Sequence, residues 1–354
     1  MKIGILTYHR AHNFGAILQA LATLHVVQKL GHDAYFVDYW PEYHRRRYLL
    51  KKPSLLLTIA KPHRFVKYLR TKGNKIARIN KYFSFIDKFV EPFCRNIGEE
   101  YDAVLYGSDQ IWRKQKELNG FNSMYFASRD INAKRYIAFS ASTDKLPSEE
   151  DKVEFKNLLT NFDAISVREE QLLGCCNSIG IQAEQVLDPT FLLSSLEWCN
   201  YLNIQKTGEA PYALFYIMKQ GVFDINVIRN FCSRRGLRLK ILHGYSIDKD
   251  DKENISITDP RDFVSLIYNA DVVFTSSFHG LAFAINMEKE FYVSTDFGVN
   301  RIKSLLDTFK LEDRFVDGKS TIGECAPIDY NKVNIIKSKK IEETKSFLIK
   351  NCTF

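Results

Sequence analysis

The chain has 354 residues, of which 45% are hydrophobic and 13% aromatic, and its formal net charge is +8. This length allows two globular domains, and no apolar run reaches the ~20 residues that a membrane-spanning helix needs. Seven cysteines form no C-x-x-C pair, and the first eight residues are too short for a signal peptide. We therefore expect a soluble protein with free thiols in the reducing cytoplasm.

The chain begins with a strand, a loop, a helix and a second strand. Residues 2–7 and 34–39 are short apolar runs typical of buried strands, and residues 15–30 carry apolar side chains at helical spacing. The polar loop between them ends at Gly15, where the missing side chain allows another group to approach the backbone closely. Because this loop lacks the spaced glycines of a dinucleotide fingerprint, we do not expect NAD to bind there.

Residues 43–86, called the basic segment below, carry the excess positive charge. Thirteen Lys and Arg and no Asp or Glu fall in this segment, which leaves 37 basic and 42 acidic residues elsewhere. Leucine, isoleucine, valine and aromatic residues are interleaved with the charges, a pattern that suits an anionic membrane face. Nucleic acid is the rival partner, but no nucleic-acid-binding motif accompanies the charge. A solvated helical face is the simpler alternative.

Strands recur after the basic segment. We expect strands at 103–106, 135–139, 164–167 and 185–187, and helices at 148–159 and 169–173. Polar residues follow two of these strands directly, with residues 107–110 after the first and Arg168 after the third. In parallel sheets ligands bind beyond such carboxyl ends. Residues 194–210 are polar and rich in turn-forming residues, and we interpret them as a linker.

The alternation of strands and helices resumes beyond this linker. Strands are expected at 212–218, 238–242, 271–275 and 291–294, and helices at 223–235, 260–269 and 281–287. Two such runs predict an α/β protein with two Rossmann-like domains, residues 1–193 and 211–330, facing across a cleft. The C-terminal residues 331–354 carry a last helix, which we expect to pack back on the first domain.

The turn after the strand at 271–275 holds the strongest cluster of candidate ligand groups. Ser276, Ser277, His279 and Gly280 lie between this strand and the next helix. The first amides of a helix are unpaired and its dipole is positive there, so the turn suits a phosphate or a carboxylate. The simpler alternative is that Ser277 caps the helix and His279 satisfies a buried turn.

Six short motifs in order resemble those of the polysaccharide pyruvyl transferase family. They are N-x-G with L-Q-A at 13–20, G-S-D-Q-I-W at 107–112, S-V-R-E at 166–169, L-D-P-T at 187–190, S-F-H-G at 277–280 and N-R-I at 300–302. The resemblance covers most of the chain and implies a GT-B-like fold with the active site between two domains. It also implies that pyruvyl moves from phosphoenolpyruvate to two hydroxyls of one sugar in a cell-surface polysaccharide precursor, which forms a ketal and releases phosphate.

This resemblance implies roles for particular residues. His279 matches the motif histidine and is the candidate acid or phosphate ligand. Asp109 is a candidate base or acceptor ligand, although an Asp that caps the next turn is the alternative.

The expected donor site lacks one charge, because many relatives carry Arg where this chain has Ser277. Arg168 and Arg301 are the nearest replacements, since a guanidinium binds carboxylate or phosphate through two hydrogen bonds. The donor is thus expected to contact Arg168, Ser276, Ser277, Gly280 and Arg301. The acceptor is expected to contact Asn13, Gly15, Gln19, Ser108 and Gln110.

No cofactor is expected beside phosphoenolpyruvate as donor substrate, and no spacing of His, Cys and Asp predicts a metal site. The implied acceptor is an oligosaccharide on polyprenyl pyrophosphate, which would bring the basic segment to the cytoplasmic face of the membrane. Two alternatives stay open: a GT-B glycosyltransferase that uses a nucleotide sugar, and a non-catalytic protein that binds glycans or membranes.

Overall fold

Two parallel β-sheets form the framework of the protein. The computed structural model describes residues 1–50, 62–218, 221–296, 298–320, 322–323 and 325–352. The first sheet consists of β1 (Lys2–Leu6), β2 (Asp33–Val37), β3 (Cys94–Arg95), β4 (Tyr101–Tyr106), β5 (Ala133–Ala141), β6 (Ala164–Val167) and β7 (Glu184–Gln185). The second consists of β8 (Tyr212–Ile217), β9 (Arg238–His243), β10 (Asn254–Ile255), β11 (Val272–Thr275) and β12 (Glu290–Val293).

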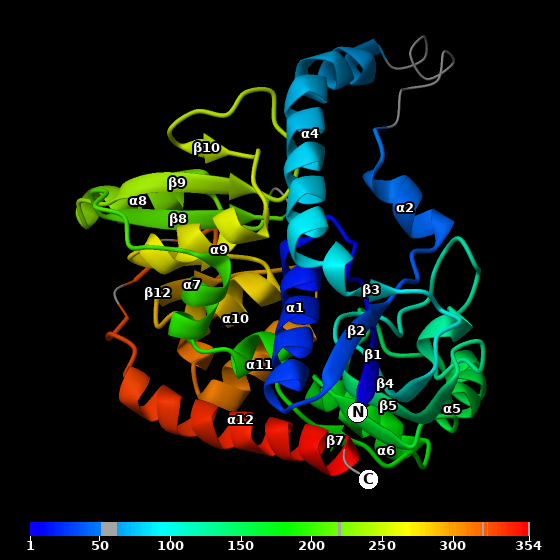
Figure 1. Cartoon of the computed structure of the whole chain (residues 1–354). Helices are drawn as coiled ribbons and strands as arrows, with labels where there is room; N and C mark the ends of the chain where they lie inside the picture. Colours follow the sequence, from blue (N-terminus) through cyan, green and yellow to red (C-terminus); the bar gives the residue numbers. More distant parts are fainter. Residues whose placement is uncertain (51–61, 219–220, 297, 321, 324, 353–354) are drawn as a thin grey trace.

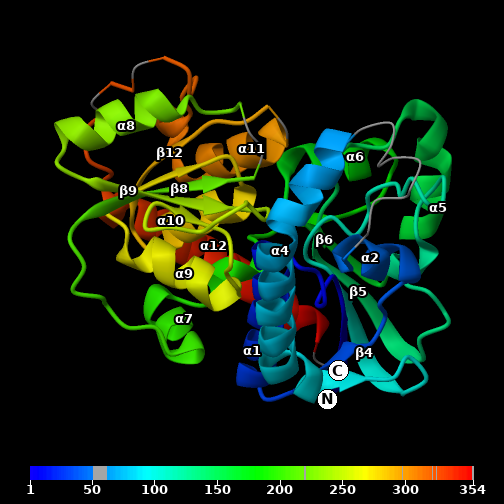
Figure 2. The same cartoon turned by 90° about the horizontal axis from the view of Figure 1, so that it is seen from above.

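Helices cover the faces of both sheets (Figures 1 and 2). Those of the first part of the chain are α1 (Phe14–Lys29), α2 (Glu42–Tyr48), α4 (Pro62–Phe89), α5 (Lys152–Leu159), α6 (Glu170–Ser178) and α7 (Ser195–Leu202). Those of the second part are α8 (Ile225–Arg234), α9 (Pro260–Asn269), α10 (Phe278–Asn286), α11 (Val299–Phe309) and α12 (Tyr330–Asn351). Short 3₁₀ turns lie at Glu91–Phe93, Ser123–Tyr125, Glu149–Asp151, Pro189–Leu192 and Glu312–Arg314.

The strand orders reverse once in each sheet. The first sheet runs β3-β2-β1-β4-β5-β6-β7 and the second β10-β9-β8-β11-β12, with every neighbouring pair parallel. The order therefore reverses between β1 and β4 in one sheet and between β8 and β11 in the other, and ligands bind at such switch points. These two sheets confirm the predicted α/β fold with two Rossmann-like units in a GT-B-like arrangement.

The segment interpreted as a linker, residues 194–210, begins with a helix that the sequence did not predict. α7 begins after Ser194, which forms a reciprocal capping box with Glu197. Trp198 is fully buried, and its indole nitrogen donates a hydrogen bond to the carbonyl of Thr190 at 3.0 Å. The sequence did not reveal this helix because only one narrow face of it packs on the core and the rest of its composition is polar.

An apolar contact joins the two sheets. Helix α1 is buried along most of its length and packs against α9 and α10 of the second unit. Phe14, at its start, stacks on Phe263 with ring centroids 4.9 Å apart. Because this contact lies beside both switch points, it holds the loops of the two sheets opposite each other.

Helix α12 runs along both units at the foot of the molecule in Figure 1. Near its end, the backbone N–H of Leu187 donates to the hydroxyl of Thr344 at 3.0 Å. The guanidinium of Arg135 donates to the carbonyl of Asn351 at 2.8 Å. The last helix is thus anchored on the first sheet.

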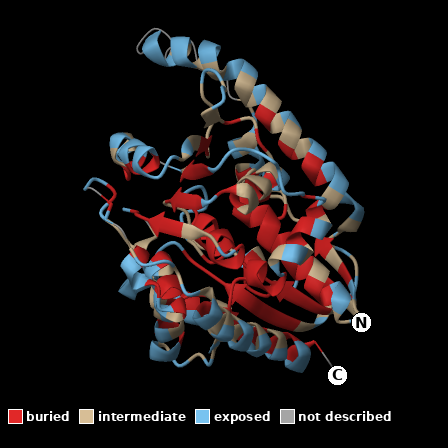
Figure 3. Ribbon diagram, turned by 90° about the vertical axis from the view of Figure 1, so that its left-hand side faces the viewer, coloured by how far each residue is buried: buried red, intermediate tan, exposed pale blue. Residues whose placement is uncertain are grey.

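Residues 51–61 of the basic segment, with Lys51, Lys52 and Lys61, lie outside the described residues. Helix α4 carries most of the part of the segment that is described. Its C-terminal half bridges the two units, because the buried guanidinium of Arg78 donates to the carbonyl of His243 at 2.9 Å. Its N-terminal half extends beyond the sheets and is largely exposed (Figures 1 and 3). No helix of the described chain is long and apolar enough to cross a membrane.

Candidate active site

A cavity of about 280 Å³ lies where the two switch points face each other. The loops after β1 and β4 contribute Tyr8, Ala11, Asn13, Asp109, Gln110 and Arg113. The loops after β8, β11 and β12 contribute Met218, Ser276, Ser277 and Gly298, and the first turns of α10 and α11 contribute His279 and Arg301. The helix that was expected from residue 281 thus begins earlier, at Phe278, and includes His279. Both halves of the fold therefore supply side chains to one site, at the edge where parallel sheets bind ligands.

Three helices begin at this cavity. Asn13, Ser277 and Gly298 are the N-cap residues of α1, α10 and α11, and all three line it. The amide oxygen of Asn13 accepts a hydrogen bond from the N–H of Ala16 at 3.1 Å, and the hydroxyl of Ser277 accepts one from the N–H of Gly280 at 3.4 Å. The capping role considered for Ser277 is thus confirmed. Because the positive ends of three helices meet here, the cavity favours an anion.

Arg301 adds a positive charge to the cavity. Its Nη1 and Nη2 atoms lie 2.5 and 2.8 Å from the side-chain oxygen of Gln110, in the amide orientation that satisfies both groups. Burial, together with the nearby charge of Arg168, lowers the pKa of Arg301. Among the described residues no carboxylate forms an ion pair with Arg301, although the charges of Glu169 and Asp109 act on it from nearby, and its guanidinium can still bind an anion.

Two further arginines lie on the side of the first sheet. Arg47, from α2, is held by the carboxylate of Glu117 at 2.9 Å. Arg113, after β4, forms no ion pair with any residue that the structure describes. Neither arginine was predicted as a site residue: Arg113 directly follows the G-S-D-Q-I-W motif, and Arg47 belongs to the basic segment that was assigned to a membrane.

His279 borders the cavity and has an 8% exposed surface. Its Nε2 atom lies 3.6 Å from a carboxylate oxygen of Asp188. On the other side of the ring, a Cβ placed on Gly15 would be 1.9 Å from the Nδ1 atom. Gly15 therefore serves a packing role, because only a residue without a side chain lets α1 approach the imidazole this closely.

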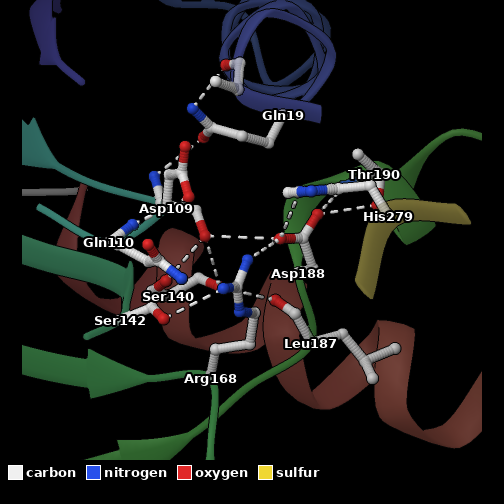
Figure 4. Close-up of polar contacts among 12 residues, drawn as sticks. Gln19, Asp109, Gln110, Ser140, Ser142, Arg168, Leu187, Asp188, Thr190 and His279 are labelled. Carbon is white, nitrogen blue, oxygen red and sulfur yellow. Dashed lines mark hydrogen bonds and ion pairs between the residues drawn. The ribbon is translucent and has the colours of Figure 1, made fainter. Parts of the chain in front are cut away.

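Asp188 connects His279 to a buried guanidinium (Figure 4). Arg168 lies 2.5 Å from the carboxylate of Asp188 and 2.8 Å from that of Glu169, and it donates to the hydroxyl of Ser142 at 2.9 Å. Burial alone would raise the pKa of Asp188, but its contact with His279 and the charge of Arg168 hold that pKa well below its usual range. Asp188 is therefore a carboxylate at any physiological pH, and it orients the imidazole.

Gln19 and Ser108 belong to the same buried network and do not line the cavity. The side-chain amide of Gln19 donates to the hydroxyl of Thr7 at 2.8 Å, and its oxygen accepts from the N–H of Ser108 at 2.9 Å. The hydroxyl of Ser108 donates to the carbonyl of Ser140 at 2.7 Å. Because their polar groups are already satisfied within the protein, these residues hold the loop after β4 in place.

Asp109 lies at the start of this loop with a left-handed backbone, φ 68°. Its carboxylate accepts a hydrogen bond from the N–H of the next residue, Gln110, at 2.8 Å. It also lines the cavity. Left-handed non-glycine residues are concentrated at functional sites.

Seven of the twelve predicted site residues line the cavity, namely Asn13, Asp109, Gln110, Ser276, Ser277, His279 and Arg301. The other five, Gly15, Gln19, Ser108, Arg168 and Gly280, lie behind it. A Cβ on Gly280 would be 2.3 Å from the hydroxyl oxygen of Thr275, so that glycine allows α10 to pack on β11. These five residues pack behind the residues that line the cavity and hold them in place.

One cluster of potential metal ligands was not predicted from the sequence. Ligand atoms of His9, Asp38 and Cys94 lie within 4.8 Å of one another, although the three residues are far apart in the chain. The guanidinium of Arg10 already donates to the carboxylate of Asp38 at 2.9 Å. Arg10 thus supplies the positive charge at this position.

Comparisons with known proteins agree with this architecture. The model of the polysaccharide pyruvyl transferase family matches residues 13–295. No curated protein matches the chain by sequence.

Solved structures with similar folds include two epimerases and a transferase. A putative UDP-N-acetylglucosamine 2-epimerase from Listeria monocytogenes is 12% identical, with 98% of this chain and 97% of that chain covered and a TM-score of 0.46. UDP-GlcNAc 2-epimerase from Neisseria meningitidis is 11% identical, with 97% and 100% covered and a TM-score of 0.45. The E. coli heptosyltransferase WaaC is 12% identical, with 97% and 100% covered and a TM-score of 0.39. These likenesses concern the fold alone.

Proposed function

The chain belongs to the polysaccharide pyruvyl transferase family, and we propose that it transfers pyruvyl from phosphoenolpyruvate to two hydroxyls of one sugar in a polysaccharide precursor. The observation that carries this proposal is the convergence of three helix N-termini, Arg301 and His279 on one cavity. Phosphoenolpyruvate bears a phosphate and a carboxylate close together, and such a dianion matches that charge. Seven free cysteines are consistent with work in the cytoplasm.

In this proposal the donor lies on the side of the second sheet. Arg301 binds one of its anionic groups through its guanidinium, and the first amides of α10, with Ser276 and Ser277, bind the other. Arg168 acts from behind as a positioning residue, because its guanidinium is already shared between Asp188 and Glu169.

The chemistry requires one proton at the donor. Protonation of the methylene carbon makes the neighbouring carbon electrophilic, and the first sugar hydroxyl attacks it and loses its proton. The carbon–oxygen bond to phosphate then breaks, phosphate leaves with the electron pair, and the second hydroxyl completes the ketal. Of the two protons that the hydroxyl groups lose, one restores the acid that protonated the methylene carbon, and the other leaves with phosphate. His279, oriented by Asp188, supplies the first proton, and Asp109 accepts one from the acceptor.

The acceptor lies on the side of the first sheet, between the loop after β1 and helix α2. Tyr8, His44 and Tyr48 give this part of the cavity an aromatic wall, and sugars bind well against such surfaces. Burial, together with the charges of Arg47 and Arg113, lowers the pKa of His44 to about 4. His44 is therefore neutral at physiological pH and serves as a hydrogen-bonding contact.

The direct test is to incubate the protein with phosphoenolpyruvate and candidate oligosaccharide acceptors. We expect release of phosphate and a product heavier by about 70 Da, the increment of a pyruvate ketal. Phosphoenolpyruvate should also raise the thermal midpoint of the protein, whereas UDP-sugars should leave it unchanged. Protection by a nucleotide sugar without protection by phosphoenolpyruvate would favour a GT-B glycosyltransferase and reject the proposal.

Gly15→Ala is expected to lower turnover strongly while the protein stays folded. The added methyl group would meet the Nδ1 atom of His279 at 1.9 Å, so the imidazole must move away from its place at the cavity. Alanine favours a helix over glycine by roughly 1 kcal/mol, which should offset part of the strain. Gly73→Ala in α4 is the control, because the added carbon meets no atom from outside its own stretch of helix within 4 Å there. Equal turnover in both variants would contradict the packing role of Gly15.

Arg113→Gln is expected to raise the KM for an acceptor that carries a phosphate or pyrophosphate group by on the order of tenfold. The affinity for phosphoenolpyruvate should change little, since Arg113 lies on the side of the first sheet. Arg45→Gln is the matched control, because Arg45 is exposed and does not line the cavity. If Arg113→Gln weakens the donor and not the acceptor, the two halves of the site are assigned the wrong way round.

A further inference from the structure

We propose that the N-terminal half of α4 is a docking surface for an anionic lipid bilayer. This inference goes beyond the transfer reaction and does not depend on it. The helix extends past both sheets on the same side of the molecule as α2, whose residues line the cavity (Figure 1). A bilayer that touches α4 would therefore lie on the side from which α2 reaches the site.

The first observation is an exposed apolar stripe on this helix. Val66, Leu69 and Ile76 are 46%, 55% and 37% exposed, and their spacing places them on one face. Arg78 and Tyr82, on the opposite face, are buried against the body of the protein. The stripe therefore turns away from the core, and packing against the described part of the chain does not explain it.

The second observation is the charge around the stripe. Arg70 and Lys72, which flank the stripe at helical spacing, are exposed, and neither forms an ion pair with a described residue. No Asp or Glu lies between residues 62 and 86, so nothing on this helix neutralises them before its last turn. A helix with an apolar stripe and uncompensated basic side chains is complementary to the interface of an anionic bilayer.

The structure also limits which basic residues take part. Arg47 lines the cavity and pairs with Glu117, Arg78 is buried, and the ammonium of Lys81 lies 2.8 Å from the carboxylate of Asp262. These three serve the site and the contact between the units. The surface proposed for the whole basic segment on the sequence alone is thus narrowed to one face of residues 66–76.

The test measures co-sedimentation of the full chain with vesicles in the absence of substrate. We expect binding to mixed phosphatidylglycerol and phosphatidylcholine vesicles at low salt, little binding to phosphatidylcholine alone, and a steep loss as salt rises. Arg70→Glu with Lys72→Glu, and separately Val66→Ser with Leu69→Ser, should each weaken binding by at least about tenfold without lowering the thermal midpoint. Because substrate is absent, this result is independent of whether the proposed transferase activity exists.

A matched control lies on α12, where the exposed Ile335 lies between basic residues. Lys332→Glu with Lys339→Glu makes the same change in net charge, and Ile335, 72% exposed, can be changed to Ser. These variants should bind vesicles like the wild type. Failure of the wild type to bind anionic vesicles at low salt, or equal losses in the α12 variants, would overturn the proposal. Conversion of a dimer to a monomer by Val66→Ser with Leu69→Ser, without vesicle binding, would assign the stripe to a second copy of the chain instead.

Discussion

Replacing His279 by Gln is expected to lower turnover by roughly 10²–10⁴-fold, the usual contribution of a positioned acid or base. The side chain lies at the cavity, and Asp188 orients it from 3.6 Å. Glutamine keeps a polar side chain of similar reach but cannot hold a transferable proton. The free energy of unfolding should change by less than about 2 kcal/mol, because the Nε2 atom of the ring has no hydrogen-bond partner among the described residues.

Release of phosphate from phosphoenolpyruvate gives the rate, and urea unfolding gives the stability. His25→Gln is the control, because His25 lies on α1 in contact with the ring of Tyr201 and outside the cavity. It should leave turnover unchanged. Wild-type turnover in His279→Gln would remove the imidazole from the chemistry, and the site would then have to act through charge alone.

The fold was predictable because its strands are short, apolar and separated by clear helical patterns. The strand at 164–167 was predicted to the residue, since the apolar run there is bounded by polar groups at both ends. Helix α7 was not predicted, because capping by Ser194 and burial of Trp198 outweigh a polar composition. The bridging role of the C-terminal half of α4 was not predicted either, because the sequence does not distinguish a buried arginine such as Arg78 from an exposed one.

The candidate site was predicted where local sequence fixes it. The turn at Ser277 and His279 follows from one strand and one helix, and the structure places both residues at the cavity. Gln19 and Ser108 were assigned to a ligand, but their partners come from distant strands, which spacing does not reveal. Asp188 was quoted within the L-D-P-T motif, but the sequence assigned it no role. Its contact with His279 joins the two units, and residues so far apart in the chain cannot be paired from the sequence.

The second large effect is expected from Arg168→Met, and it concerns stability. This change leaves the carboxylates of Asp188 and Glu169 buried without their cation, which typically costs about 3–5 kcal/mol of unfolding free energy.

Arg301→Met should cost far less, because Arg301 has no carboxylate partner in the described chain, but it should weaken binding of phosphoenolpyruvate by on the order of 10²-fold. Equal unfolding midpoints in urea for Arg168→Met and the wild type would contradict the buried role of Arg168.

The pH dependence of this difference provides a further check. Arg168 and His279 hold the pKa of Asp188 below the value of about 3.9 that it has in the unfolded chain. Their stabilisation is therefore complete above that unfolded pKa and is lost as the pH falls toward the folded pKa. Without Arg168 the folded pKa of Asp188 rises, so the stability gap between wild type and Arg168→Met should be widest near neutral pH and narrow as the solution is acidified. A gap that stays constant from neutral pH into the acid range would show that lost packing, and not the buried charge, causes the destabilisation.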